Sequence, residues 1–275
     1  MGRQAKTQNI IDQARDILQE YHPMTLRQVY YQLVSGQVIE NSRSAYQGVS
    51  NALVDARLEG SIPWEWLEDR LRRPSIYGGY RDPAHFALVM KYRYYRDIWP
   101  TQPRRFEAWL EKDALSGIFT NVCSRYNVTL NVGRGYDGWD SIHNAAERYG
   151  TGENWTILYY GDFDPSGDDM VRSLRERLGQ LRSFPTIIKI ALSMDDVTRY
   201  ELPPNKTKPT DTRRGAFIEK HGDVAVELDA LRPAVLEESL RTEIEKLMDM
   251  SAFRATEEQE KKDRELIEEA LRAIS

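Results

Sequence analysis

The chain has 275 residues, 40% of them hydrophobic, and a formal net charge of −5 at pH 7. This length predicts two domains with a sizeable core, and the mild acidity argues mildly against a polyanionic ligand, an objection that the uneven distribution of charge softens. No run approaches the ~20 apolar residues that span a bilayer, and no charged-then-apolar signal pattern opens the chain, so we expect a cytoplasmic protein without a membrane partner. The single cysteine, Cys123, excludes an internal disulfide and a cysteine-based zinc site.

Three helical patterns open the chain. Apolar residues recur at helical spacing over 8–21, 26–34 and 44–58. Thr25 precedes the second pattern as a helix cap, and the segment 60–66 after the third has the composition of a turn and a short strand. Three short helices and a wing predict a winged-helix module, whose third helix would offer Arg43 and Arg57 to a DNA groove. Many such modules bind only protein, so the layout alone leaves both partners open.

The second helical pattern contains two adjacent tyrosines, Tyr30 and Tyr31. Neighbours on a helix point about 100° apart, so one can face the core while the other reaches a surface. A phenol can attack phosphorus when a base, a cation or a metal offsets its pKa of about 10. Arg27 lies one turn before Tyr31 and is placed to polarise a phosphate. Core packing is the commoner explanation of such a pair.

The segment 70–105 has nine basic residues against two acidic ones, and seven aromatic residues. Cations interleaved with aromatic rings suit a phosphate backbone and exposed bases. The alternative is a connection between domains whose aromatic rings pack at the domain contact. Charge pattern alone does not decide between them.

From residue 104 onward, strand and helix patterns alternate, which predicts a parallel sheet covered by helices. The expected strands are 105–112, 126–133, 155–160 and 186–192. The segment 203–222 has the composition of a long loop, either beside a DNA path or over a metal site. The last segment, 256–275, is expected to be a charged amphipathic helix without chemistry.

Three carboxylates follow these strands. Asp162 and Asp164 come directly after the 155–160 strand, and Glu111 ends the first one. Open α/β sheets bind ligands at the carboxyl ends of their strands, and residues two apart in an extended chain share a face. Converging acids repel one another unless a cation lies between them, and such hard oxygen ligands suit Mg²⁺. The alternative for the two aspartates is an acidic turn that caps the next helix.

In order and spacing, several segments resemble the A subunit of topoisomerase VI and its relatives that make meiotic double-strand breaks. These segments are 26–31, 110–114, 133–136, 161–167, 195–203 and 226–231. The resemblance covers about residues 8–250 and implies an α/β protein with a winged-helix domain followed by a TOPRIM domain. The implied parts are a winged helix over 1–75, a basic aromatic linker over 76–103, a TOPRIM domain over 104–255 and a C-terminal helix over 256–275.

By matching positions, the resemblance implies that Tyr31 is the attacking phenol and that Arg27 assists at the phosphate. The carboxylates that would hold Mg²⁺, or Mn²⁺ in its place, are Glu111, Asp162 and Asp164. The expected DNA-binding arginines are Arg43, Arg57 and Arg134.

The implied function is Mg²⁺-dependent cleavage of double-stranded DNA by a type IIB topoisomerase-like enzyme associated with the nucleoid. It would act as a homodimer in which each tyrosine works against the partner's metal site. The chain has no Gly-x-x-x-x-Gly-Lys-Ser/Thr phosphate loop, so we expect no ATP site, and an ATPase partner of the B-subunit type would come from another gene.

Three other functions remain open. A hydrolytic TOPRIM nuclease would use a metal-bound water and leave Tyr31 structural. A winged-helix protein without catalysis would only bind DNA. A phosphatase-like domain would use Asp162 as its nucleophile but would leave Glu111 unexplained.

Overall fold

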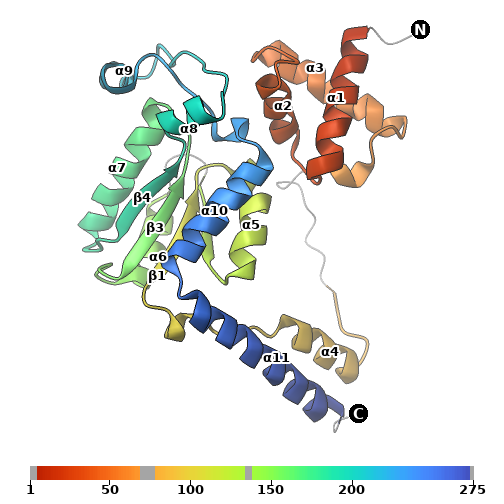
Figure 1. Cartoon of the computed structure of the whole chain (residues 1–275), viewed down its shortest axis with the longest axis vertical. Helices are drawn as coiled ribbons and strands as arrows, with labels where there is room; N and C mark the ends of the chain where they lie inside the picture. Colours follow the sequence, from red (N-terminus) through yellow and green to blue (C-terminus); the bar gives the residue numbers. More distant parts are fainter. Residues whose placement is uncertain (1–4, 69–77, 134–137, 273–275) are drawn as a thin grey trace.

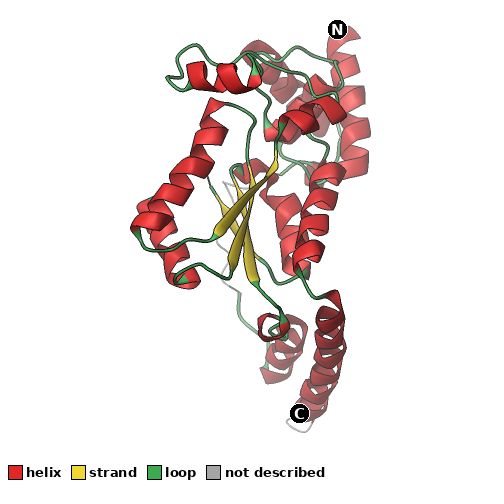
Figure 2. Cartoon of the chain, turned by 60° about the vertical axis from the view of Figure 1, so that its left-hand side comes forward, coloured by secondary structure: helices red, strands yellow, loops and turns green. Residues whose placement is uncertain are grey.

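The computed structural model describes residues 5–68, 78–133 and 138–272 (Figure 1). An N-terminal module of three helices is followed by a parallel sheet with helices on both faces, and a pair of helices extends from the far end of the sheet (Figures 1 and 2). Within the described residues, no helix is both long and apolar enough to cross a membrane.

The N-terminal module consists of α1 (Ala5–Tyr21), α2 (Leu26–Ser35) and α3 (Arg43–Leu58). Thr25 caps α2 in both directions: its hydroxyl accepts from the Gln28 N–H, and its own N–H donates to the Gln28 side chain at 2.6 Å. This reciprocal pair satisfies two backbone donors that would otherwise be free. Buried residues of all three helices, such as Leu18, Leu33 and Leu53, form one core.

The expected wing is wrong for the described residues. Segment 60–67 forms a turn and a short 3-10 helix, and a single β-bridge joins its end to Met24. Pro63 lacks the N–H that a strand needs, and the Arg57 guanidinium lies 4.0 Å from the centre of the Trp64 ring. The segment therefore packs back on α3, and the module has three helices without a paired wing there.

Four strands form one parallel sheet in the order β2-β1-β3-β4, which confirms the expected α/β class. They are β1 (Arg105–Leu110), β2 (Thr129–Val132), β3 (Trp155–Tyr160) and β4 (Thr186–Ala191). β3 spans the expected residues. β2 begins three residues late because the N–H groups of residues 126–128 bond back to the preceding helix.

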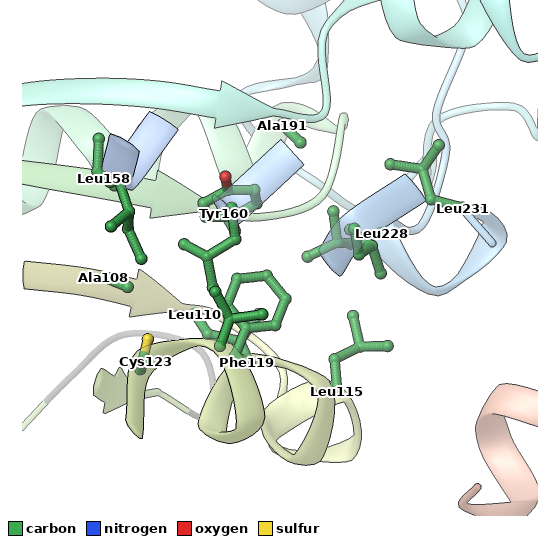
Figure 3. Close-up of a cluster of buried hydrophobic side chains, with 14 of the residues drawn as sticks. Ala108, Leu110, Leu115, Phe119, Cys123, Leu158, Tyr160, Ala191, Leu228 and Leu231 are labelled. Carbon is green, nitrogen blue, oxygen red and sulfur yellow. The ribbon is translucent and has the colours of Figure 1, made fainter. Parts of the chain in front are cut away.

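Two layers of helices cover the sheet (Figure 2). One face packs on α5 (Ser116–Arg125) and α10 (Pro233–Leu247), the other on α6 (Trp139–Tyr149) and α7 (Pro165–Gln180). Side chains alternate along each strand, so Leu110 and Tyr160 face the first layer whereas Trp109 and Tyr159 face the second. Figure 3 shows side chains of the hydrophobic core on the face that packs against α5 and α10.

Shorter helices lie after β4, namely α8 (Met194–Arg199), α9 (Arg214–His221) and a 3-10 helix at Leu228–Ala230. We call this last element the 228–230 turn. Part of the loop expected at 203–222 is therefore helical. Leu228 of this turn is completely buried in the core cluster.

The basic aromatic segment contains a helix, α4 (Pro83–Arg93), that packs along α11 (Met250–Arg272). Lys91 pairs with Glu268, and Arg96 pairs with Asp263 at 2.6 Å. Two cations of the segment left open between DNA binding and a connection between domains are thus paired with acids of the C-terminal helix. That helix begins six residues before the expected boundary at 256, so the linker and the C-terminal helix form one two-helix arm.

Candidate functional site

The carboxyl ends of β1 and β3 bring Glu111 and Asp162 together. The Glu111 N–H extends the β1–β3 ladder by donating to the Tyr160 carbonyl at 2.9 Å. The Glu111 carboxylate then accepts from the Asp162 N–H at 2.9 Å. Gly161 permits this contact because a Cβ there would lie 2.5 Å from Glu111 Oε2. The strand-end expectation for these two acids is therefore confirmed in its geometry.

Asp164 begins α7. Its Oδ1 accepts from the Gly167 N–H at 2.7 Å, so the capping alternative is confirmed for this residue. A Cβ at Gly167 would lie 2.3 Å from the Asp162 carbonyl oxygen, which explains why the tight turn ends on glycine. Asp162 has no such capping role.

Lys112 joins Asp162 to two further acids. Its Nζ lies 2.9 Å from Asp162 Oδ1 and 2.8 Å from Asp229 Oδ2, and it also pairs with Glu227. The Lys112 side chain is only 11% exposed, and that of Asp229 is completely buried. Neither carboxylate oxygen of Asp229 makes a hydrogen bond among the described residues, so ion pairs alone hold it. We call Lys112, Asp162, Glu227 and Asp229 the ion cluster.

Burial shifts the pKa values of the charged side chains at this edge of the sheet. It raises the pKa of Asp162 to about 8, although the charge of Lys112 acts in the opposite direction. Burial also raises the pKa of Glu111. It disfavours the charged form of Lys112, but the attraction of Asp229, Asp162 and Glu227 is stronger and raises the pKa of this lysine.

Helix α2 packs against the 228–230 turn, far away in sequence. The Gln32 amide donates to the carbonyls of Asp229 and Leu231 at 3.3 and 3.1 Å, and the Ser35 hydroxyl donates to the Ala230 carbonyl at 3.1 Å. These bonds satisfy buried carbonyls of the turn. They also fix which face of α2 meets the carboxylate edge of the sheet.

Arg27 strengthens this contact. Its guanidinium donates to Glu227 at 2.7 Å and lies 3.5 Å from Asp229. The same group lies 5.1 Å from the centre of the Tyr31 ring. Burial opposes its charge, but Asp229 and Glu227 outweigh burial and raise the pKa of Arg27. Arg27 is therefore a fixed cation beside Tyr31.

The two tyrosines of α2 have different surroundings. The Tyr30 hydroxyl donates to Asn41 Oδ1 at 2.9 Å and accepts from the Ser42 N–H at 2.9 Å, so it holds the start of α3. The Tyr31 hydroxyl makes no hydrogen bond within the described part of the chain, and the residue is 9% exposed. Burial and the charge of Glu227 raise the pKa of Tyr31, while nearby cations lower it.

Tyr31 lines a cavity of about 260 Å³ together with Asp162 and Asp164. These are residues of one chain, whereas the resemblance implied the partner's carboxylates. The cavity is also lined by Asn205, Lys206, Lys208 and Asp211. A second hollow, of about 330 Å³, shares Tyr31 and Asn41 with the first and includes Arg27 and Arg43. Tyr31 thus lines both hollows.

The two expected DNA-binding arginines that the structure describes, Arg43 and Arg57, do not lie together. Arg43 is exposed and lines the second hollow beside Tyr31. Arg57 lies ~21 Å further along α3, at 1.5 Å per residue, and is engaged with Trp64. Arg134 lies outside the described residues.

The chemistry of the acids suits a hard cation, but their positions do not yet form a metal site. Among the described residues, no three Asp, Glu, His or Cys side chains are arranged to hold a metal ion. One carboxylate oxygen accepts a hydrogen bond from a backbone N–H in each of the three expected ligands, Glu111, Asp162 and Asp164. No hydrogen bond within the described residues reaches the second oxygen of any of the three. Carboxylate oxygens are ligands that suit Mg²⁺ by their chemistry.

The sequence reasoning missed the ion cluster. Lys112, Glu227 and Asp229 all lie in the segments 110–114 and 226–231 that support the resemblance, but only Glu111 received a role. The feature that could have indicated the cluster is Lys112, a lysine directly after Glu111 at the end of a strand. Its partners could not be found by local pattern.

Comparisons with known proteins add no family to this geometry. A scan against models of protein families gave no match, and a search of curated proteins also gave none.

Proposed function

We propose that this chain cleaves double-stranded DNA by transesterification, with the Tyr31 hydroxyl as nucleophile. The observation that carries the proposal is that Tyr31 shares a cavity with Asp162 and Asp164 while the neighbouring Tyr30 hydroxyl is bonded elsewhere. A phenol beside strand-end carboxylates and a fixed guanidinium supplies a nucleophile and charge stabilisation of the kind that phosphoryl transfer can use.

In the proposed reaction the Tyr31 oxygen bonds to phosphorus and the bond from phosphorus to the 3′ oxygen breaks. This gives a 5′-phosphotyrosyl bond and a free 3′-hydroxyl. The phenol loses a proton as its bond forms, and the departing oxygen takes one up. Arg27, 5.1 Å from the Tyr31 ring centre, stabilises the anionic phosphate. A Mg²⁺ ion on Glu111, Asp162 and Asp164 would supply positive charge at the phosphate and the leaving oxygen.

The proposal keeps the assignment to a topoisomerase VI A-subunit-like enzyme with a TOPRIM domain. A homodimer would cut both strands, and an ATPase partner from another gene would be required for strand passage. Association with the nucleoid follows from the proposed substrate.

A single gel experiment tests the mechanism. The protein is incubated with end-labelled duplex DNA and Mg²⁺ or Mn²⁺, stopped with SDS, and run with and without protease beside Tyr31→Phe. We expect label that travels with the protein until protease is added, and its loss in Tyr31→Phe. Protein-free cleaved ends that persist in Tyr31→Phe would refute the tyrosine mechanism.

The second candidate is a hydrolytic nuclease. The observation that favours it is that burial raises the pKa of Tyr31, which keeps the hydroxyl protonated in the free protein. Tyr31 would then be a packing residue beside the carboxylates. Cleavage without a covalent adduct in the same gel would support this function.

A further inference from the structure

Part of the lining of the cavity that contains Tyr31 is a fixed, extended segment. The backbone N–H and carbonyl groups of Asn205 and Ala225 bond to each other at 2.8 and 2.7 Å. Thr207, two residues on, is completely enclosed: its N–H and hydroxyl donate to Asp223 at 3.0 and 2.5 Å, and Arg214 donates to its hydroxyl at 2.7 Å. The segment 205–208 is thus fixed from the inside.

This anchoring directs two lysines outward. Neighbours in an extended chain point to opposite sides, so a buried Thr207 places Lys206 and Lys208 on the other side. Both lysines are exposed and line the cavity that contains Tyr31.

The two lysines differ from the other cations of the site. Arg27 and Lys112 also form ion pairs with Glu227 and Asp229. Neither Lys206 nor Lys208 has an ion-pair partner within the described residues. Four carboxylates, Asp162, Asp164, Asp211 and Glu227, line the same cavity, and the charge of Lys208 helps to lower the pKa of Asp211 and of Glu227. The two exposed ammonium groups are therefore the part of the cavity lining that can attract an anionic ligand toward Tyr31.

We propose that Lys206 and Lys208 bind the backbone phosphates of the DNA strand that Tyr31 attacks. Residues two apart in an extended chain lie ~6.6–6.8 Å apart, comparable with the separation of adjacent phosphates along a strand. The pair would hold the strand across the cavity and position its phosphodiester against the Tyr31 oxygen. This inference rests on the proposed function, because it names the part of the site that holds the substrate.

The test measures DNA binding separately from cleavage. The 275-residue chain with Tyr31→Phe carries either Lys206→Gln and Lys208→Gln or, as the matched control, Lys261→Gln and Lys262→Gln on α11. Fluorescence anisotropy gives the Kd for a labelled duplex at several KCl concentrations. Each lysine that contacts a phosphate contributes about 0.9 to the slope of log K against log salt. We expect the slope to fall by about 1.8 in the cavity variant and to stay constant in the control.

The outcomes separate the two proposals. An unchanged slope in the cavity variant, or an equal fall in the control, overturns the inference, even if the unmodified chain forms the covalent adduct. A selective fall without any adduct supports phosphate binding while refuting the tyrosine mechanism. An unmodified chain that binds no duplex overturns both.

Discussion

Lys112→Met should destabilise the protein severely. The change keeps most of the side-chain volume but removes the cation that Asp162, Glu227 and Asp229 share. Removing one partner of a buried pair costs about 3–5 kcal/mol because the other charge stays buried. The Lys112 side chain is only 11% exposed, so solvent screening should reduce this loss of free energy only a little. After the substitution, Arg27, 3.5 Å from Asp229, is the cation that remains near this acid.

The assay is urea unfolding followed by circular dichroism and by tryptophan fluorescence. The matched control is Lys246→Met, whose side chain is 61% exposed and pairs with Glu243 on the same helix. An exposed helix pair of this kind contributes only about 0.2–0.5 kcal/mol. A loss below about 1 kcal/mol for Lys112→Met, or a loss equal to that of the control, would refute the reasoning.

The pH dependence supplies a second check. Burial already raises the pKa of Asp162 to about 8, and loss of Lys112 removes the main influence that lowers it. A carboxyl with a raised folded-state pKa binds more protons in the folded than in the unfolded state, so the free energy of unfolding falls as pH rises. The deficit of Lys112→Met should therefore be larger at pH 8.5 than at pH 5.5. An equal deficit at both pH values would contradict this explanation.

Four further changes test other parts of the structure. Tyr30→Phe should lower the free energy of unfolding by about 0.5–1.5 kcal/mol, since it removes the hydrogen bonds of the Tyr30 hydroxyl to the exposed Asn41 and the half-buried Ser42, yet preserve the covalent adduct; a melting curve and the protease gel check both. Gly167→Ala should abolish the adduct, because its Cβ would lie 2.3 Å from the Asp162 carbonyl oxygen, and an active variant would contradict that geometry. An equimolar mixture of Tyr31→Phe and Asp162→Asn chains should stay inactive if the cavity acts within one chain; restored cleavage would instead show that the partner's carboxylates are used. Asp263→Asn should speed hydrogen exchange in α4, because this acid accepts from Tyr94 and Arg96, and unchanged exchange would deny that it holds the arm.

The local sequence predicted helices and strands correctly where the spacing of apolar residues clearly favoured one of the two. β3 spans the expected residues because its apolar run is buried on both faces, and the Thr25 cap of α2 is confirmed because both of its partners lie within one helical turn. The wing failed because a strand needs a partner, and Pro63 and the contact of Arg57 with Trp64 turned the segment back on α3. The charge pattern of 70–105 left DNA binding and a connection between domains open, and only the structure showed that acids of α11 pair with two of its cations.

By itself, the sequence determined that Glu111, Asp162 and Asp164 follow strand ends, because parallel strands finish at one edge of a sheet. Only the tertiary structure decided that Tyr31, and not Tyr30, joins Asp162 and Asp164 in one cavity. That choice depends on Gln32 and the 228–230 turn, which lie 197 residues apart at the Gln32–Asp229 bond. The spacing of apolar residues along a helix indicates which face is buried. Which distant carbonyls and charges contact that face is decided only when the helix packs in the folded protein.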